Sequence, residues 1–407
     1  MSVTIDPEIL EKAGDFNLDE ISVKTITNDK VDFKAAFIEL NIFESIYSNA
    51  VNGNIVIRDS GNFINQYAIS GQETIAFNVH TPGAEGDDQI DFKKFPARVY
   101  KVSDKVPTKE REQVYTLHFT STEAVKNLRT RFSKALTGTT GEMAQTILTD
   151  KNYIGTDKKV FVEDTQNIHK IVFPYTRPFG AVSMLARRSE SSTYNTPGFL
   201  FFETHRGYNF RSYESLTHID KDPIPEQFLF SDMPYARDPN NPAMRDIVFD
   251  MSTIKEFRIM KTTDLLADTA SGMLNSTLYT HDIHSKSFTK TEFKYLDNFK
   301  NRLHIDQNVF QTDYNTSFSP LYSETPETQD GKLTSDFTSS KIMVTPRATK
   351  LHSETKDDPR DYDNRTNIWL QNSLSNKLST NAIQMEMTVH GNTYLAAGDV
   401  IRVNIQS

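Results

Sequence analysis

The stretch that decides the fold class runs from residue 383 to residue 390 and reads IQMEMTVH. Every second side chain is apolar: Ile383, Met385, Met387 and Val389. The side chains between them are polar: Gln384, Glu386, Thr388 and His390. Because successive side chains of a strand point to opposite faces, this alternation predicts a half-buried β-strand. We expect the apolar set to face a barrel core. The polar set, Gln384, Glu386, Thr388 and His390, is the candidate lumen or interface face, exposed to a water-filled channel or to a polar contact between protomers.

The same period of two recurs through both ends of the chain. It is clearest in residues 36–43, 74–80, 115–120, 257–259 and 401–405. Between the first two, Asn52-Gly53-Asn54 is expected to turn the chain, and Asp59-Ser60 is suited to cap a helix-sized stretch at 61–67. The pattern predicts a first antiparallel tube β-barrel domain over residues 32–122. A second tube β-barrel domain is expected over 246–300 and 375–407.

The period changes in the middle of the chain. Thr139 and Glu142 form a predicted capping box in front of a helix at 143–148. A second helix is expected at 179–186. Two strands rich in aromatic residues follow at 199–204 and 208–213, and a turn at Arg206-Gly207 connects them. We therefore predict an α+β domain over 123–220, followed by a proline-rich connector over 221–245.

Two segments are too polar to predict a core of their own. They are residues 1–31, expected to form an N-terminal arm, and residues 301–374, expected to form a long inserted arm. Ordering a residue costs about 1–2 kcal/mol of backbone entropy, so we expect both arms to order only against neighbouring chains. The predicted fold class is mixed β and α+β, with two tube-type antiparallel β-barrel domains flanking an α+β domain and a long inserted arm.

Composition narrows the functional classes. The chain has 407 residues and a net charge of -9, which argues against nonspecific binding to nucleic acid or to an anionic membrane. No apolar run is long enough to span a membrane and the N-terminus does not resemble a signal peptide, so a soluble protein that is not exported by a cleaved signal is expected. The absence of cysteine excludes disulfides, thiolate metal sites and cysteine nucleophiles.

No strong catalytic motif is present, and the weaker signals favour structural explanations. His281 and His284 have a spacing that suits a metal on a helix, but the surrounding residues favour a strand. The glycine-flanked turn at 138–141 could receive an anion, although a capping box would occupy its N–H groups. The acidic loop at 357–363 lacks the glycine and glutamate of an EF-hand. We therefore predict no catalytic residue, no cofactor and no metal ligand.

Three stretches, taken in order, resemble the baseplate hub family of contractile-tailed phages. This family includes the T-even hub proteins, and it is related to Mu-like tail proteins and to the hub portion of VgrG spikes. The first stretch is residues 37–79, with GNIVIRDSGNFINQYAISGQETIAFNV at 53–79. The second is RPFGAVSMLARRSESS at 177–192 with GFLFFETHRGYNFRSYESL at 198–216. The third is MEMTVHGNTYLAAGDVIRVNI at 385–405.

The resemblance implies a structural, non-enzymatic protein of the virion tail baseplate that assembles in the host cytoplasm. It implies a homotrimer in which two barrels per chain give a ring of pseudo-sixfold symmetry, joining the sixfold tail tube to the threefold central spike. The implied partners are a trimeric spike protein, tail tube or tube-initiator ring proteins, baseplate wedge proteins and the tape measure protein. DNA would pass through the channel only in transit during genome ejection, and no membrane partner is implied.

Two other classes of function remain open from the sequence. A tail-associated cell-wall or polysaccharide hydrolase would need acidic and aromatic side chains clustered in a cleft. A monomeric carbohydrate-binding module is disfavoured because barrel-type alternation occurs on both sides of a helical domain.

Overall fold

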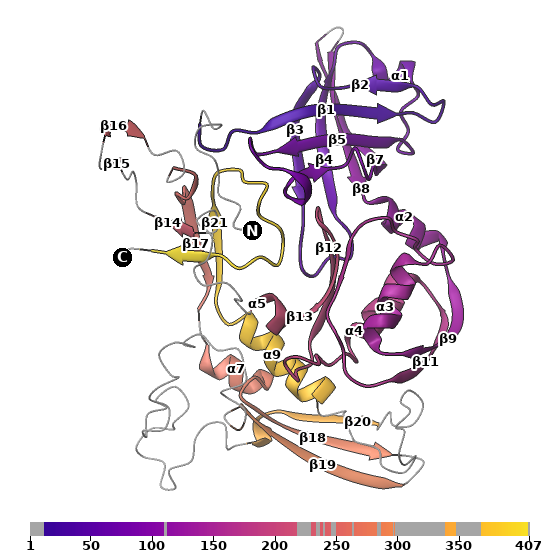
Figure 1. The fold of residues 1–407 in the computed structure, drawn as a ribbon, viewed down its shortest axis with the longest axis vertical. Coiled ribbons are helices and arrows are strands. Elements are labelled where there is room, and N and C mark those ends of the chain that lie inside the picture. The colour runs from indigo at the N-terminus through magenta and orange to yellow at the C-terminus, as the bar shows by residue number, and fades with distance from the viewer. Residues whose placement is uncertain are drawn as a thin grey trace.

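The computed structural model describes residues 12–109, 112–217, 229–232, 237–238, 241–245, 250–262, 264–282, 286–295, 297, 338–346 and 368–405. These residues form mostly β-sheet with a few helices, which confirms the mixed β and α+β class (Figure 1). Within them, no helix is both long and apolar enough to cross a membrane.

The N-terminal region is one antiparallel sheet whose strands differ in length. Its strands are β1 (Asn17–Lys24), β2 (Lys30–Asp32), β3 (Phe37–Phe43), β4 (Asn52–Asp59), β5 (Thr74–His80), β6 (Ile90–Asp91), β7 (Ala97–Lys109) and β8 (Glu112–Thr120). They pair in the order β2-β1-β5-β7-β8-β4-β3, and β6 adds to β5. Apolar side chains from alternate positions, such as Ile55, Phe77 and Leu117, are fully buried in its core. The order ends at β2 and β3, so these described strands form an open sheet, and closure into a tube-type barrel stays a prediction.

Strand β1 differs from the expectation of an arm over residues 1–31. It pairs with β5 and buries Ile21 and Val23 completely. A β-bulge between Leu18 and Glu20 shifts the register, so the apolar positions do not alternate through the whole strand. Because of this irregularity, the sequence of the strand does not show the alternation of apolar and polar residues that predicts a strand.

Gly53 lies inside β4 and does not make the expected turn. A Cβ added at Gly53 would lie 2.2 Å from Cζ of Phe119 and 2.5 Å from the carbonyl oxygen of Asn41. The glycine is therefore required by close packing within the sheet and not by a turn conformation. The expected cap is present, since the Asp59 carboxylate accepts hydrogen bonds from the N–H groups of residues 63 and 64 at 2.9 and 3.1 Å. It caps α1 (Phe63–Gln66).

The middle region packs helices on sheets, as expected. Its elements are α2 (Thr122–Arg129), β9 (Phe132–Gly138), α3 (Thr140–Thr149), β10 (Val160–Val162), β11 (His169–Thr176), α4 (Pro178–Ala186), β12 (Phe199–Thr204), β13 (Gly207–Ser212) and α5 (Tyr213–Thr217). The capping box between Thr139 and Glu142 is formed in both directions. Strand β13 lies between β10 and β12, and α3 and α4 pack against one face of this sheet (Figure 1).

The C-terminal region consists of several small sheets. Its described elements are β14 (Leu229–Ser231), β15 (Arg237–Asp238), β16 (Asn241–Arg245), β17 (Glu256–Lys261), α7 (Leu265–Ser271), β18 (Asn275–Asp282), β19 (Ser287–Lys294), β20 (Ile342–Pro346), the π-helical turn Ile368–Asn372, α9 (Ser373–Thr380), β21 (Gln384–Thr388) and β22 (Arg402–Asn404). The pairs are β14 with β22, β15 with β16, β17 with β21, and β18 with both β19 and β20. These described strands are not joined into one barrel, so the second tube barrel also stays a prediction.

Strand β20 falls within the segment expected to be an inserted arm. It pairs in parallel with β18, where Leu278 is fully buried. The short apolar run at 342–344 is diluted by the polar residues around it, so average composition does not reveal it. Residues 301–337 and 347–367 of the expected arm lie outside the described residues.

We predict that Gly53→Ala lowers the free energy of unfolding by about 1–3 kcal/mol, because the added methyl group must displace the Phe119 ring or the β3 backbone. Gly391→Ala is the matched control, since nothing lies within 4 Å of a Cβ at that position. The control should change stability by no more than about 0.5 kcal/mol. Urea denaturation of both variants measures the difference, and equal stability would contradict this account of Gly53.

Candidate functional site

The predicted polar face lies on β21, and three of its four residues share the expected side. Gln384, Glu386 and Thr388 are exposed, while Met385 and Met387 between them are partly buried. The strand pairs with β17, which places charged residues across from this face: Lys261 opposite Gln384, Arg258 opposite Glu386 and Glu256 opposite Thr388. The face is thus polar and carries both signs of charge.

His390 lies apart from the other three. Strand β21 ends at Thr388, and the His390 ring packs against Gly14, with a backbone hydrogen bond at Ala13. Burial, together with the charge of Lys255, lowers the pKa of His390 below its ordinary value. The alternation in the sequence continues past the end of the strand, so the sequence alone could not place this residue.

A buried cluster of three charges joins the first sheet to the middle region. The Nζ atom of Lys158 lies 2.5 Å from Oε1 of Glu203 on β12 and 3.1 Å from Oε2 of Glu123 on α2. The Lys158 side chain is 9% exposed and that of Glu203 is 1% exposed. The other oxygen of Glu203 accepts a hydrogen bond of 2.8 Å from the N–H of Val51, immediately before β4. The cluster therefore links backbone of one region to side chains of the other.

The two glutamates respond differently to this environment. Burial raises the pKa of Glu203 in spite of its contact with Lys158. Burial also acts to raise that of Glu123, but the charge of Lys158 and a hydrogen bond from Thr156 leave the pKa of Glu123 lowered. Burial acts to lower the pKa of Lys158, yet both carboxylates keep it raised. One ammonium group is thus held between two carboxyl groups in an environment from which water is excluded.

The C-terminal loop, residues 391–399, returns to both of the earlier regions (Figure 1). Thr81 and Thr393 exchange hydrogen bonds from backbone N–H to side-chain hydroxyl at 2.9 and 3.0 Å. The Glu44 carboxylate accepts hydrogen bonds from the N–H of Ala397 at 3.1 Å and from the N–H and Nδ1 of His205 at 2.5 and 3.0 Å. The loop, the first sheet and the turn between β12 and β13 therefore meet at one place.

Arg206, in the turn between β12 and β13, holds the end of this loop. Its Nη1 lies 3.1 Å from each carboxylate oxygen of Asp399, and its Nη2 donates to the carbonyl of Tyr394 and lies 3.4 Å from Asp88. Asp399 also accepts a hydrogen bond of 2.8 Å from the N–H of Ala396. The sequence predicted the turn at Arg206-Gly207, but nothing in it pairs Arg206 with a residue as distant as Asp399.

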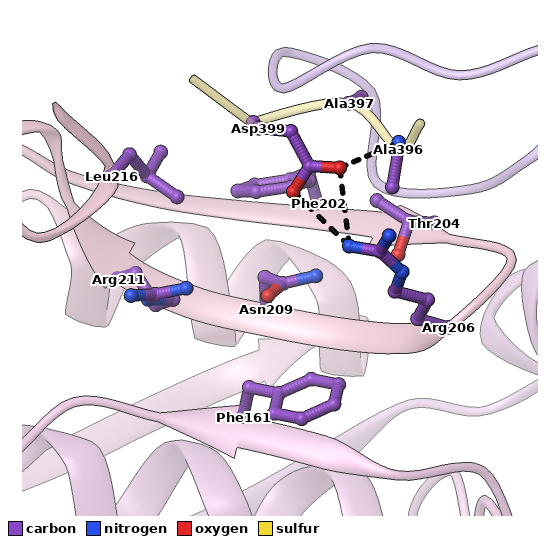
Figure 2. A pocket seen from close by; sticks show the side chains of 11 residues that line it. Phe161, Phe202, Thr204, Arg206, Asn209, Arg211, Leu216, Ala396, Ala397 and Asp399 are labelled. Carbon is purple, nitrogen blue, oxygen red and sulfur yellow. Dashed lines mark hydrogen bonds and ion pairs between the residues drawn. The ribbon is translucent and has the colours of Figure 1, made fainter. Parts of the chain in front are cut away.

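A small pocket lies under the loop, against the face of the β10-β13-β12 sheet that α3 and α4 leave uncovered. Its volume is about 150 Å³. Figure 2 shows Asn209 of β13 between Phe161 of β10 and the pair of Arg206 and Asp399, with Arg211 farther along the same strand. The pocket thus combines aromatic surface with polar side chains from three strands and the loop. No pattern in the sequence predicts this pocket, because the sheet and the loop that enclose it come from distant segments.

The weaker sequence signals do not converge on a chemical centre in the described part of the chain. No group of three or more His, Asp or Glu side chains is arranged there to hold a metal ion. His281 lies on β18, whereas His284 and residues 357–363 lie outside the described residues. At the turn 138–141, the Thr139 hydroxyl and the Glu142 carboxylate occupy capping N–H groups, and the N–H of Gly141 donates to Thr165.

The chain was compared with known families and structures. No protein-family model and no curated protein sequence matches it. Its structural neighbours include tail proteins and VgrG complexes. A tail protein from Neisseria meningitidis has a TM-score of 0.48 at 10% identity, over 95% of this chain and 86% of that one. The 43 kDa tail protein of prophage MuSo2 from Shewanella oneidensis has a TM-score of 0.46 at 9% identity, over 95% and 88%. A Francisella PdpA-VgrG complex has a TM-score of 0.36 at 10% identity, over 86% and 42%.

We predict that Lys158→Met lowers the free energy of unfolding by about 3–5 kcal/mol, because two carboxyl groups remain buried without their counter-charge. The loss should grow as the pH rises from about 5 to about 8. A group whose folded pKa is raised, as for Glu203, stabilises the fold below its unfolded pKa and loses that contribution at higher pH.

Urea denaturation across this pH range measures the effect. The double variant Lys158→Met with Glu203→Gln is the control, since the amide cannot ionise, and it should recover part of the loss at the higher pH. A Lys158→Met variant whose stability relative to wild type did not change with pH would contradict the interpretation.

We also predict opposite outcomes for two neighbours on β21. Glu386→Lys should fold with a loss of no more than about 1 kcal/mol, because the side chain is exposed and the only cost is the like charge of Arg258 opposite it. Met387→Asp should destabilise the β17–β21 ribbon, since it places a carboxylate opposite Phe257 on the apolar side. Thermal melting of the two variants tests the assignment, and the reverse result would mean that the two faces of β21 are exchanged.

Proposed function

We propose that the protein is a structural baseplate hub protein of a contractile phage tail, and that three copies form a ring with a central channel. The ring would join the sixfold tail tube to the threefold spike and leave a path for DNA. The domains proposed for this role are a first tube domain at 32–122, an α+β domain at 123–220, and a second tube domain at 246–300 and 375–407. Residues 221–245 would connect the latter two, and residues 1–31 and 301–374 would contact neighbouring proteins.

The observation that carries the proposal is the open edge of the first sheet. Strand β3 is seven residues long, and among the described strands only β4 pairs with it. Two large apolar side chains of this edge strand are exposed, Ile38 at 52% and Phe43 at 55%. An edge of this length with apolar side chains pairs readily with another chain unless it is covered. Pairing across protomers would cover it and would extend the sheets around a ring.

The second support comes from the contacts between regions. The cluster around Lys158 and the contacts of Glu44 and Arg206 connect backbone and side chains across the regions, and no group of side chains in the described part of the chain is arranged to hold a metal ion. The three stretches of sequence that resemble the hub family also fall in the three regions so connected. Such a protein would transmit load between neighbours rather than act on a substrate.

The proposed role also implies a location for the protein and a set of binding partners. We propose the virion tail baseplate as the site of action, with assembly in the host cytoplasm. The partners would be the trimeric spike, tube or tube-initiator ring proteins, wedge proteins and the tape measure protein. Gln384, Glu386 and Thr388 would face the lumen or a protomer interface. DNA would contact the protein only in transit.

We predict that the double variant Ile38→Lys with Phe43→Lys stays folded but does not form the ring. Two added charges on an edge strand oppose pairing with a second chain. Leu128→Lys is the matched control, because Leu128 is equally exposed, at 59%, but lies on α2 away from the edge. Negative-stain imaging and mass photometry of the full chain measure assembly.

A ring in wild type and control, with monomers in the double variant, is the expected result. Rings of normal yield in the double variant would refute edge pairing. A wild-type chain that stayed monomeric even with its spike partner present would refute the hub itself.

The competing hydrolase predicts a different result with the same protein. Purified chain should release no reducing sugar from capsular polysaccharide and give no clearing on a peptidoglycan zymogram. Turnover that disappeared when one acidic residue was changed to its amide would replace the structural proposal with an enzymatic one.

A further inference from the structure

The pocket beneath the C-terminal loop has a polar side chain, Asn209, whose amide is open to it. Asn209 is only 9% exposed, and its side chain faces the pocket between Phe161 and Arg206 (Figure 2). No group of the described residues bonds its amide, and the amide atoms remain accessible from the pocket. An accessible amide at the wall of a pocket offers donors and an acceptor to a group that replaces water there.

Arg211 supplies a positive charge beside this amide. Its Nε and Nη2 donate to the hydroxyl and carbonyl of Ser215 at 3.0 and 3.1 Å, which fixes the guanidinium plane. The remaining N–H groups are not used by these contacts, and no carboxylate of the described residues pairs with Arg211. A fixed guanidinium with free donors is suited to bind a carboxylate.

The other charges that line the pocket already compensate each other. Arg206 is paired with Asp399 through two contacts of 3.1 Å, and its second terminal nitrogen is directed to Asp88 and the Tyr394 carbonyl. The charge left for an incoming group is therefore that of Arg211. Donors from Arg211 and from the Asn209 amide together favour an anionic acceptor.

The size of the pocket limits what can enter. Its volume of about 150 Å³ is smaller than the roughly 300–1,000 Å³ of pockets that hold cofactors or drug-sized ligands. Phe161 is 39% exposed and offers aromatic surface to the methylene groups of a bound side chain. One side chain fits these dimensions, whereas a nucleotide or a sugar chain does not.

We propose that this pocket binds one acidic side chain, a glutamate or aspartate presented by a neighbouring protein chain. The carboxylate accepts hydrogen bonds from Arg211 and Asn209, and the stem of the side chain lies against Phe161. The proposal concerns the isolated chain and does not depend on assembly into a ring, so it can stand or fall independently of the hub function.

The test is saturation-transfer difference NMR on the full-length protein with three probes. Acetyl-Gly-Glu-Gly-amide presents the acidic side chain, acetyl-Gly-Gln-Gly-amide is its uncharged match, and glutarate is a free small carboxylate. We expect the glutamate peptide to bind with a Kd of about 1 mM and the glutamine peptide about tenfold more weakly. Binding of the glutamate peptide should weaken as salt is added.

Variants assign the binding to this pocket. Arg211→Met should weaken binding of the glutamate peptide about tenfold, since it removes the guanidinium but keeps an unbranched side chain. Asn209→Leu removes the amide at similar volume and should also weaken binding. Arg98→Met is the control, because Arg98 is an exposed arginine on β7 bonded to Thr74, and it should bind like wild type. Thermal melting establishes that each variant is folded.

Several outcomes would overturn the proposal. These are no saturation transfer from the glutamate peptide, equal binding of the glutamate and glutamine peptides, or unchanged binding by both folded pocket variants. Tighter binding of glutarate than of the glutamate peptide would assign the pocket to a free small carboxylate instead of a protein side chain.

Discussion

The placement of the Lys158 ammonium between Glu123 and Glu203 constrains how the first sheet meets the middle region. Removing these groups from water is costly, and the cost is offset only while the distances of 2.5 and 3.1 Å are kept. Because Glu203 also binds the N–H of Val51, a shift of the first sheet would leave a buried carboxyl group and a buried N–H without partners. The relative position of the two regions is thus fixed by charge and hydrogen bonding as well as by apolar contact.

The C-terminal loop adds a second set of constraints of the same kind. Thr393, Ala397 and Asp399 each bind a residue that is distant in the sequence. These partners are Thr81 just after β5, Glu44 just after β3, and Arg206 in the β12–β13 turn. Closing such long loops has an entropic cost that grows slowly with length, so several polar contacts are enough to offset it. The loop also encloses the pocket, which means that the pocket exists only when these contacts are made.

Three surfaces of the described residues are suited to contact other chains. The first sheet ends in an apolar edge strand, and the β17–β21 ribbon presents a polar face of mixed charge. The pocket offers Arg211, which pairs with no carboxylate of the described residues. Each is a different type of contact: backbone pairing, charge complementarity and insertion of a side chain. A chain that joins several neighbours needs such distinct contacts, because each neighbour must be distinguished from the others.

The sequence by itself determined most of the local structure. Alternation placed β3, β5, β8 and β21, and the Thr139–Glu142 pair placed the start of α3, since these signals depend on residues that are close together in the chain. It missed β1, where a bulge interrupts the alternation, and it assigned Gly53 to a turn because the Phe119 ring that requires the glycine is contributed by β8. Only the tertiary structure brought Lys158 to its two glutamates, Arg206 to Asp399, and Asn209 and Arg211 to a common pocket. The physical reason is that charge pairing and enclosure depend on distances in space, and a sequence pattern reports only distances along the chain.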